Sequence, residues 1–386
     1  MPQRAFFIAL MLVAANMRPA VTGVGPLLET IRQDLGLSAT VAGVLASLPV
    51  MVFAALAPLA RLAGRMGAER LLLAGMLGLI AGLLVRSTGF VSTLFIGTVV
   101  LATGIALMNV LMAVLIKQHY PERVPSITTA YATTMGGIAA LASGVSVPMS
   151  QWLPGGWRGS MASWVVLAVI GALFWLPHAR RAPVETAAKA ASAHAAASQS
   201  PWRTALAWQI TAYMGVQSAV FYISISWFPA ILRETGFTAA AAGWLLTLLQ
   251  VAALLAGLAM PPLMQRYRDQ RGLTLVTAGL ATLAVLGILL APKAAVLWVI
   301  VLGCGSGPSL ILSLSFMGLR AKTPQSAATL SMMSQVFGYL IAAIGPIVFG
   351  LTHDFTHGWT LGLLGVVALT LLQGVCGLGA GRARKV

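Results

Sequence analysis

The sequence is poor in charged side chains, and most of the few it has are basic. Only 8% of its 386 residues are Asp, Glu, Lys or Arg, whereas a water-soluble chain usually carries about 25%. Apolar residues make up 59%. So few charges cannot cover a surface that faces water, which excludes a cytoplasmic enzyme, a secreted disulfide scaffold and a disordered chain. The composition indicates an integral membrane protein.

Residues that form disulfides, bind metals or relay protons are also scarce. The two cysteines, Cys304 and Cys376, lie inside apolar runs, and the five histidines show no metal-binding spacing. No metal and no cofactor are therefore expected. All eight acidic residues lie in loops or at the ends of apolar runs, which argues against a carboxylate proton relay within the membrane. The basic residues form short clusters between apolar runs, a pattern typical of membrane orientation rather than nucleic-acid binding.

Twelve apolar runs are long enough to cross a bilayer as helices, which takes about 20 residues each. Because the runs are continuous rather than alternating, a β-barrel is excluded. The sequence predicts an all-α membrane protein of twelve transmembrane helices, with a six-helix bundle at 1–178, a polar cytoplasmic linker at 179–203 and a second six-helix bundle at 204–386. The expected spans are 6–28, 40–62, 70–88, 93–116, 125–149, 160–177, 204–230, 240–263, 272–291, 294–317, 326–350 and 358–380.

The two halves resemble each other at an offset of 200 residues. SATVAGVL at 38–45 aligns with TAAAAGWL at 238–245. Both halves begin on the same side of the membrane, so the bundles form a parallel pseudo-symmetric repeat, an arrangement typical of carriers that work by alternating access. Most Lys and Arg residues fall in segments that are inside if the N-terminus is inside, which predicts a multi-pass bacterial inner-membrane protein with both termini cytoplasmic. The outer segments hold Arg32, Arg86, Arg158, Arg233 and Lys293.

Arg18 is the most informative residue. It lies midway along the first predicted span with no acid at membrane depth to pair with it, and a guanidinium exposed to lipid there would cost at least a few kcal/mol. Three interpretations are open: Arg18 binds an anionic substrate, it is a structural arginine capped by main-chain carbonyls, or it is a gate residue. Pro19 follows directly and is expected to kink or loosen the span.

Other polar side chains lie deep in the spans, several at matching positions of the two halves. Thr22 shares a helical stripe with Arg18, and the offset of 200 places Ser218 and Tyr222 on the corresponding stripe of span seven. Hydrogen bonding between helices is the alternative interpretation for each of them. Pro19, Gly345 and Pro346 are expected to be bending points. The candidate substrate-binding residues are Asn16, Arg18, Thr22, Asn109, Tyr131, Gln217, Ser218, Tyr222, Gln335 and Tyr339.

The twelve spans and the repeat resemble the major facilitator superfamily. Its loop between spans two and three resembles LARLAGRMGAER at 59–70, although Gly64 stands where that family usually has an aspartate. The chain is also similar to the cyanate permease and nitroimidazole transporter branch, which implies a substrate path lined by spans one, four, seven and ten, with Arg18 and Asn109 as site residues. The matching motifs are NMRP at 16–19, GPLL at 25–28, GIALMNV at 104–110, IK at 116–117, GWR at 156–158, GVQS at 215–218, Tyr222 and WFP at 227–229.

Together these features predict a secondary active or facilitative transporter that carries a small anion, cyanate-like or organic, across the inner membrane. Its expected partners are that anion and membrane lipids, with no nucleic acid, and it is expected to act as a monomer and not as an enzyme. One alternative is a multidrug exporter of compact lipophilic compounds, suggested by 17 methionines. Another is a membrane receptor or enzyme that transports nothing.

Overall fold

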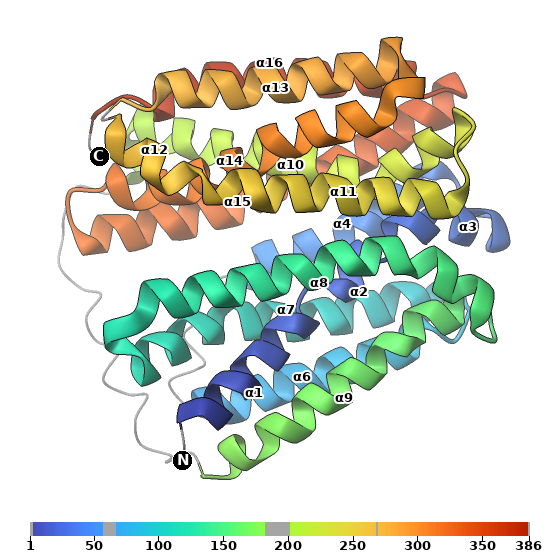
Figure 1. Ribbon diagram of the computed structural model, residues 1–386, viewed down its shortest axis with the longest axis horizontal. Helices are drawn as coiled ribbons and strands as arrows, with labels where there is room; N and C mark the ends of the chain where they lie inside the picture. The colour runs from blue at the N-terminus through green and yellow to red at the C-terminus, as the bar shows by residue number, and fades with distance from the viewer. Residues whose placement is uncertain (1–2, 57–66, 182–200, 268, 385–386) are drawn as a thin grey trace.

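The computed structural model describes residues 3–56, 67–181, 201–267 and 269–384 (Figure 1). Within these ranges twelve helices are long and apolar enough to cross a membrane, so the predicted fold class is confirmed. Most of the predicted linker and most of the loop at 59–70, Gly64 included, lie outside the described residues.

The first span is interrupted next to Arg18. Helix α1 (Gln3–Asn16) ends before it, α2 (Pro19–Thr22) begins after it, and α3 (Gly25–Asp34) follows a second break. At that second break the amide of Val24 donates to the carbonyl of Val21 (3.3 Å) rather than to that of Ala20. The interruption expected at Pro19 is therefore present, and it leaves the Ala20 carbonyl without a helical donor.

Several helix ends match between the halves at the predicted offset. Helices α3 and α10 end at Asp34 and Glu234, and each is followed by a glycine with positive φ, Gly36 at 61° and Gly236 at 100°. A left-handed residue at this position is a common way to end a helix. The bounds of the other helices are α4 (Ala39–Leu56), α6 (Ala68–Arg86), α7 (Val91–His119), α8 (Val124–Trp152), α9 (Trp157–Arg181), α10 (Ala205–Glu234), α11 (Ala239–Leu258), α12 (Met260–Arg266), α13 (Arg271–Leu290), α14 (Ala295–Leu319), α15 (Pro324–Thr356) and α16 (Thr360–Ala380).

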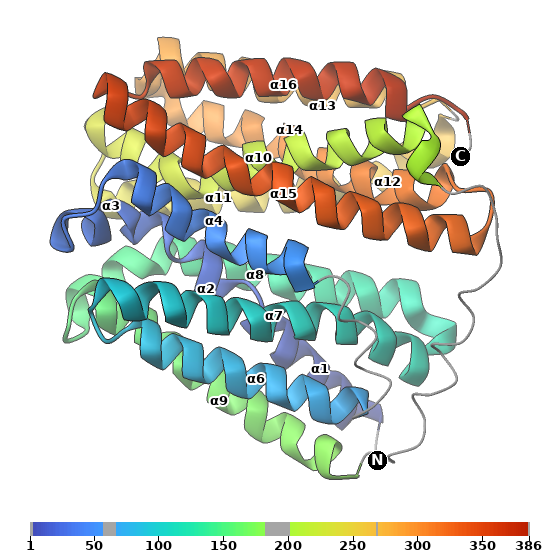
Figure 2. The same cartoon turned by 180° about the vertical axis from the view of Figure 1, so that it is seen from behind.

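The two bundles lie side by side with their helices roughly along one direction (Figures 1 and 2). Helices α1 to α9 form one bundle and α10 to α16 the other. Both chain termini lie at the same end of the molecule, which we call the terminal end; the other we call the distal end. Helix α3 and the loop between α3 and α4 lie at the distal end (Figure 2).

The buried apolar side chains differ between the two ends. In the distal halves of the helices one cluster joins both bundles: it contains Leu28 of α3 and Leu45 of α4 as well as Ile225 of α10 and Phe349 of α15. In the terminal halves each bundle has a cluster of its own. Among the described residues, the buried apolar cluster shared by both bundles thus lies toward the distal end.

Candidate functional site

The Arg18 side chain lies where the two bundles meet. Arg18 is the residue before α2, and its carbonyl accepts from the amides of Val21 (2.9 Å) and Thr22 (3.0 Å). The side chain is half-buried, and among the described residues the groups that interact with its guanidinium are three tyrosines. No carboxylate in the described part of the chain forms an ion pair with it. Its positive charge is therefore uncompensated.

The three tyrosines come from both bundles. Tyr222 of α10 accepts a hydrogen bond from the Arg18 side chain, and Tyr131 of α8 and Tyr339 of α15 lie close enough for electrostatic interaction with it. Tyr131 packs against the core of the first bundle, whereas Tyr222 belongs to the core shared at the distal end. We call Arg18, Tyr131, Tyr222 and Tyr339 the tyrosine site. Phenols provide hydrogen bonds but no negative charge at neutral pH.

Two more of the predicted residues lie near this site. Tyr131 donates a hydrogen bond to the Oδ1 of Asn109 (3.2 Å), whose side chain is exposed at this point of α7. Gln335 is half-buried one helical turn before Tyr339 on α15 and donates to Ser331 (3.0 Å). Both amides could therefore reach a bound molecule beside the tyrosine site.

Other predicted residues are held by contacts within the protein. Asn16 is buried and donates to the carbonyls of Leu12 (2.8 Å) and Leu167 (3.2 Å). Thr22 donates to Ala139 of α8 (3.0 Å). Gln217 donates to the hydroxyl of its neighbour Ser218 (2.8 Å), and both are buried in α10. These bonds fasten the broken first span to α8 and α9, or stay within α10. Thr22 also donates to the main-chain carbonyl of Arg18 (3.2 Å), but none of these bonds uses the Arg18 side chain.

The expected bending points differ in structure. Pro19 stands at a real break, but Gly345 and Pro346 lie inside the continuous helix α15. There the carbonyl of Pro346 accepts from the Trp227 indole (3.0 Å) and lies so close to α4 that a Cβ at Gly43 would be 2.4 Å from it. This part of α15 is a contact surface between the bundles.

Hydrogen bonds also cross between the bundles toward the distal end. Asp354 of α15 accepts from the amides of Ala39 (2.9 Å) and Thr40 (2.7 Å) and from the Thr40 hydroxyl (2.6 Å), so it caps the N-terminus of α4. Gln250 of α11 donates to Ser143 of α8 (2.7 Å). These bonds must break if the bundles separate at this end.

Asp354→Ala is expected to favour separation at the distal end. It removes three bonds to a charged acceptor, each worth about 1.5–3 kcal/mol, so the equilibrium between closed and open distal ends should shift by at least about tenfold. Spin labels at Phe90→Cys and Leu290→Cys, both exposed distal positions in a background without Cys304 and Cys376, should show a larger population of long distances. Glu234→Gln, an exposed acid at the same end, serves as control, and an unchanged distribution in Asp354→Ala would show that Asp354 does not hold this end closed.

The burial of Arg86 was not predicted from the sequence. Arg86, assigned to an outer loop, is the last residue of α6 and is only 2% exposed. Helix α6 packs closely on α7 and so keeps Arg86 buried. A Cβ at Gly97 would lie 2.4 Å from the main-chain nitrogen of Arg86. The signal that could have identified it is its position inside the apolar run at 70–88.

Comparison with known proteins gives a consistent family and fold. The model of the Major Facilitator Superfamily matches residues 6–346. The chain is similar to an uncharacterized transporter of Bacillus subtilis (strain 168), at 42% identity over 97% of this chain and 92% of that protein. It is also similar to a 2-nitroimidazole transporter of Escherichia coli (strain K12), at 40% identity over 98% of this chain and 95% of that one, and to a cyanate transport protein of the same organism, at 30% identity over 95% of each.

A solved structure has the same fold at low sequence identity. A bacterial homolog of the human lysosomal transporter Spinster superposes with a TM-score of 0.79 at 15% identity, covering 99% of this chain and 98% of that one. At this level of identity the likeness concerns the arrangement of the helices.

Proposed function

Because the chain belongs to the Major Facilitator Superfamily, we propose that it carries a small anion across the membrane by alternating access between its two bundles. The family and the candidate spans make it a multi-pass transporter of a bacterial inner membrane. The substrate, the orientation and the site residues are the proposed parts.

The observation that carries the proposal is the uncompensated guanidinium of Arg18 at the junction of the bundles. A buried cation without a counter-ion is costly, and the groups around it are phenols, which orient a ligand without neutralising the charge. Since the guanidinium donates to a side-chain hydroxyl and not to main-chain carbonyls in the described contacts, this geometry favours an anion-binding arginine over a structural one.

Relatives suggest the chemical class of the substrate. Proteins similar to this chain are named for cyanate, an anion, and for 2-nitroimidazole, a compact heterocycle whose planar nitro group presents two oxygens. A guanidinium matches both, because its planar fork of N–H donors pairs with a negative charge or with two oxygens side by side. We therefore propose a compact anion or planar weak acid as the substrate.

The structure also suggests which state it represents. Lys and Arg residues are concentrated in the segments predicted to be inside, which supports a cytoplasmic terminal end by the positive-inside rule. The shared core at the distal end then closes the outer side, and the tyrosine site would be reached from the cytoplasm.

Binding of an anion would couple occupancy to closure. An empty site carries a charge that resists enclosure in a dry interface, and a bound anion removes that penalty. Because Tyr131 belongs to one bundle and Tyr222 and Tyr339 to the other, an anion held by all three draws the bundles together. The ligand thus binds the closed intermediate more tightly than it binds the open state. A population shift requires this difference in affinity.

The proposal is tested by counterflow in proteoliposomes that contain the purified protein. Cyanate and benzoate are expected to exchange, and 2-nitroimidazole to compete with them, whereas the lipophilic cation tetraphenylphosphonium should neither exchange nor compete because Arg18 repels it. Exchange of the cation, together with broad competition by unrelated lipophilic compounds, would instead support a multidrug exporter.

A further inference from the structure

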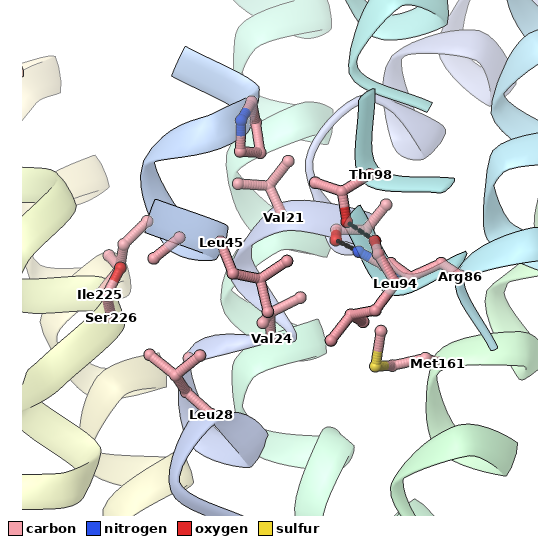
Figure 3. Close-up of a pocket in the computed structure, with 14 residues that line it drawn as sticks. Val21, Val24, Leu28, Leu45, Arg86, Leu94, Thr98, Met161, Ile225 and Ser226 are labelled. Atoms are coloured by element: carbon pink, nitrogen blue, oxygen red, sulfur yellow. Dashed lines mark hydrogen bonds between the residues drawn. The ribbon is translucent and has the colours of Figure 1, made fainter. Parts of the chain in front are cut away.

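Arg86 lines a cavity on the distal side of the broken first span (Figure 3). The cavity is narrow, with room for about one water molecule, and its walls are mostly apolar, with Val21, Val24, Leu28 and Leu45 among the lining residues. In Figure 3 the Arg86 side chain lies beside Leu94 and Thr98, whereas Ile225 and Ser226 of α10 lie on the opposite side, beyond Leu45 and Val24.

The guanidinium of Arg86 is not satisfied by the protein. In the described part of the chain it makes one hydrogen bond, from Nη1 to the carbonyl of Ala20 (2.6 Å), and its buried Nε has no partner. That carbonyl is the one freed by the second break of the first span. A carbonyl offers a partial charge only, so the cation stays uncompensated, and a buried charge normally has a counter-ion.

The hydrogen bond to the Ala20 carbonyl at the break in the first span does not explain why residue 86 carries a positive charge. A neutral amide could donate to the Ala20 carbonyl equally well and would leave no buried cation. A buried cation with a donor that no described protein group uses, set in apolar walls, is suited to binding a small anion.

We propose that Arg86 forms a second anion-binding subsite on the distal side of Arg18. The proposal rests on the proposed function for the class of ligand. Arg18 directly precedes α2 and Arg86 bonds the second residue of α2, so the two cations flank one short helix. Since α10 walls the cavity through Ile225 and Ser226, separation of the bundles at the distal end opens it. Arg86 is thus the first cation that an anion meets from that side.

The test measures how anions raise the thermal unfolding temperature of the detergent-purified protein, which exposes both ends to the probe. The probes are cyanate, nitrate and benzoate. Anions that bind the folded protein raise this temperature by mass action. We expect Arg18→Ala to retain part of the anion-dependent shift, and we expect the double variant Arg18→Ala with Arg86→Gln to lose it. Arg18→Ala with Ala46→Leu, which fills the cavity without removing Arg86 or its bond to Ala20, should lose it as well.

Arg158→Gln in the Arg18→Ala background is the matched control. Arg158 is a distal arginine already paired with Asp34 (2.8 Å), so the residual shift should persist in this variant. If Arg18→Ala alone abolishes the whole shift, the second subsite is wrong and the proposed function stands. If the residual shift survives both double variants, the additional anion binds elsewhere and the proposal is likewise overturned. If no anion shifts the wild type, the proposed function itself is contradicted together with the subsite.

Discussion

Arg18→Ala and Arg18→Lys are both expected to reduce anion transport severely. Removing one partner of a desolvated, hydrogen-bonded charge pair costs about 2–5 kcal/mol, which is roughly a 30-fold to several-thousand-fold loss of affinity. Lysine keeps the charge but lacks the planar arrangement of N–H donors of a guanidinium. Its single ammonium group cannot hold the anion and Tyr222 at the same time. The measurement is counterflow of labelled cyanate or benzoate in proteoliposomes with matched amounts of protein.

Arg18→Ala also has an expected effect on the thermal stability of the protein. Because the Arg18 charge is uncompensated in the empty protein, its removal should leave the thermal stability of the ligand-free protein unchanged or increased, as expected when function and stability oppose each other at a site. Arg233→Gln, which alters an arginine of α10 that donates a hydrogen bond to Thr30 (3.4 Å), is the control. Transport at the wild-type rate by Arg18→Ala would remove the basis for an anionic substrate.

Gly25→Ala is expected to stop the transport cycle although it adds a single methyl group. A Cβ at Gly25 of α3 would lie 1.8 Å from the carbonyl oxygen of Ile225 in α10. The position of a Cβ is fixed by its own backbone, and the carbonyl of Ile225 belongs to the main chain. No side-chain rotation can therefore relieve the clash, and the bundles cannot close at the distal end. We expect counterflow to fall by at least about 100-fold, since even a few kcal/mol against one obligatory state suffices.

The conformational effect of Gly25→Ala can be measured directly. Spin labels at positions 90 and 290 should report mainly long distances, because the variant is held open at the distal end. Gly279→Ala in α13 is the matched control, as a Cβ there has no neighbour within 4 Å. A Gly25→Ala protein that transports normally and keeps the wild-type distances would mean that the contact between α3 and α10 is not part of the cycle.

Much of the fold could be predicted because it depends on local sequence. Span length and apolar composition determine the twelve helices, and the offset of 200 is visible in matching helix ends at Asp34 and Glu234. The break at Pro19 follows from its missing N–H. Candidate site residues were found by the same logic, since a polar side chain deep in an apolar run needs a partner.

What the sequence could not provide is which partner each side chain finds. Asn16 and Thr22 share the first span with Arg18, yet their hydrogen bonds to distant segments go to carbonyls of α9 and α8. Asp354 lies between two predicted spans, and only the packing of α15 on α4 brings it to the N-terminus of α4. Arg86 is buried because two glycine-containing helices pack closely, a tertiary effect with no local signature. Contacts between distant segments require the folded structure.

The central claim is that Arg18 recognises negative charge, and the most direct test compares two ligands of nearly the same shape. Benzoate is an anion, whereas benzamide has the same ring and a planar neutral group. Thermal unfolding of the wild type should be shifted upward by benzoate and left unchanged by benzamide, and Arg18→Ala should lose most of the benzoate effect. Equal shifts by the two compounds, or a benzoate shift that Arg18→Ala retains in full, would contradict the account.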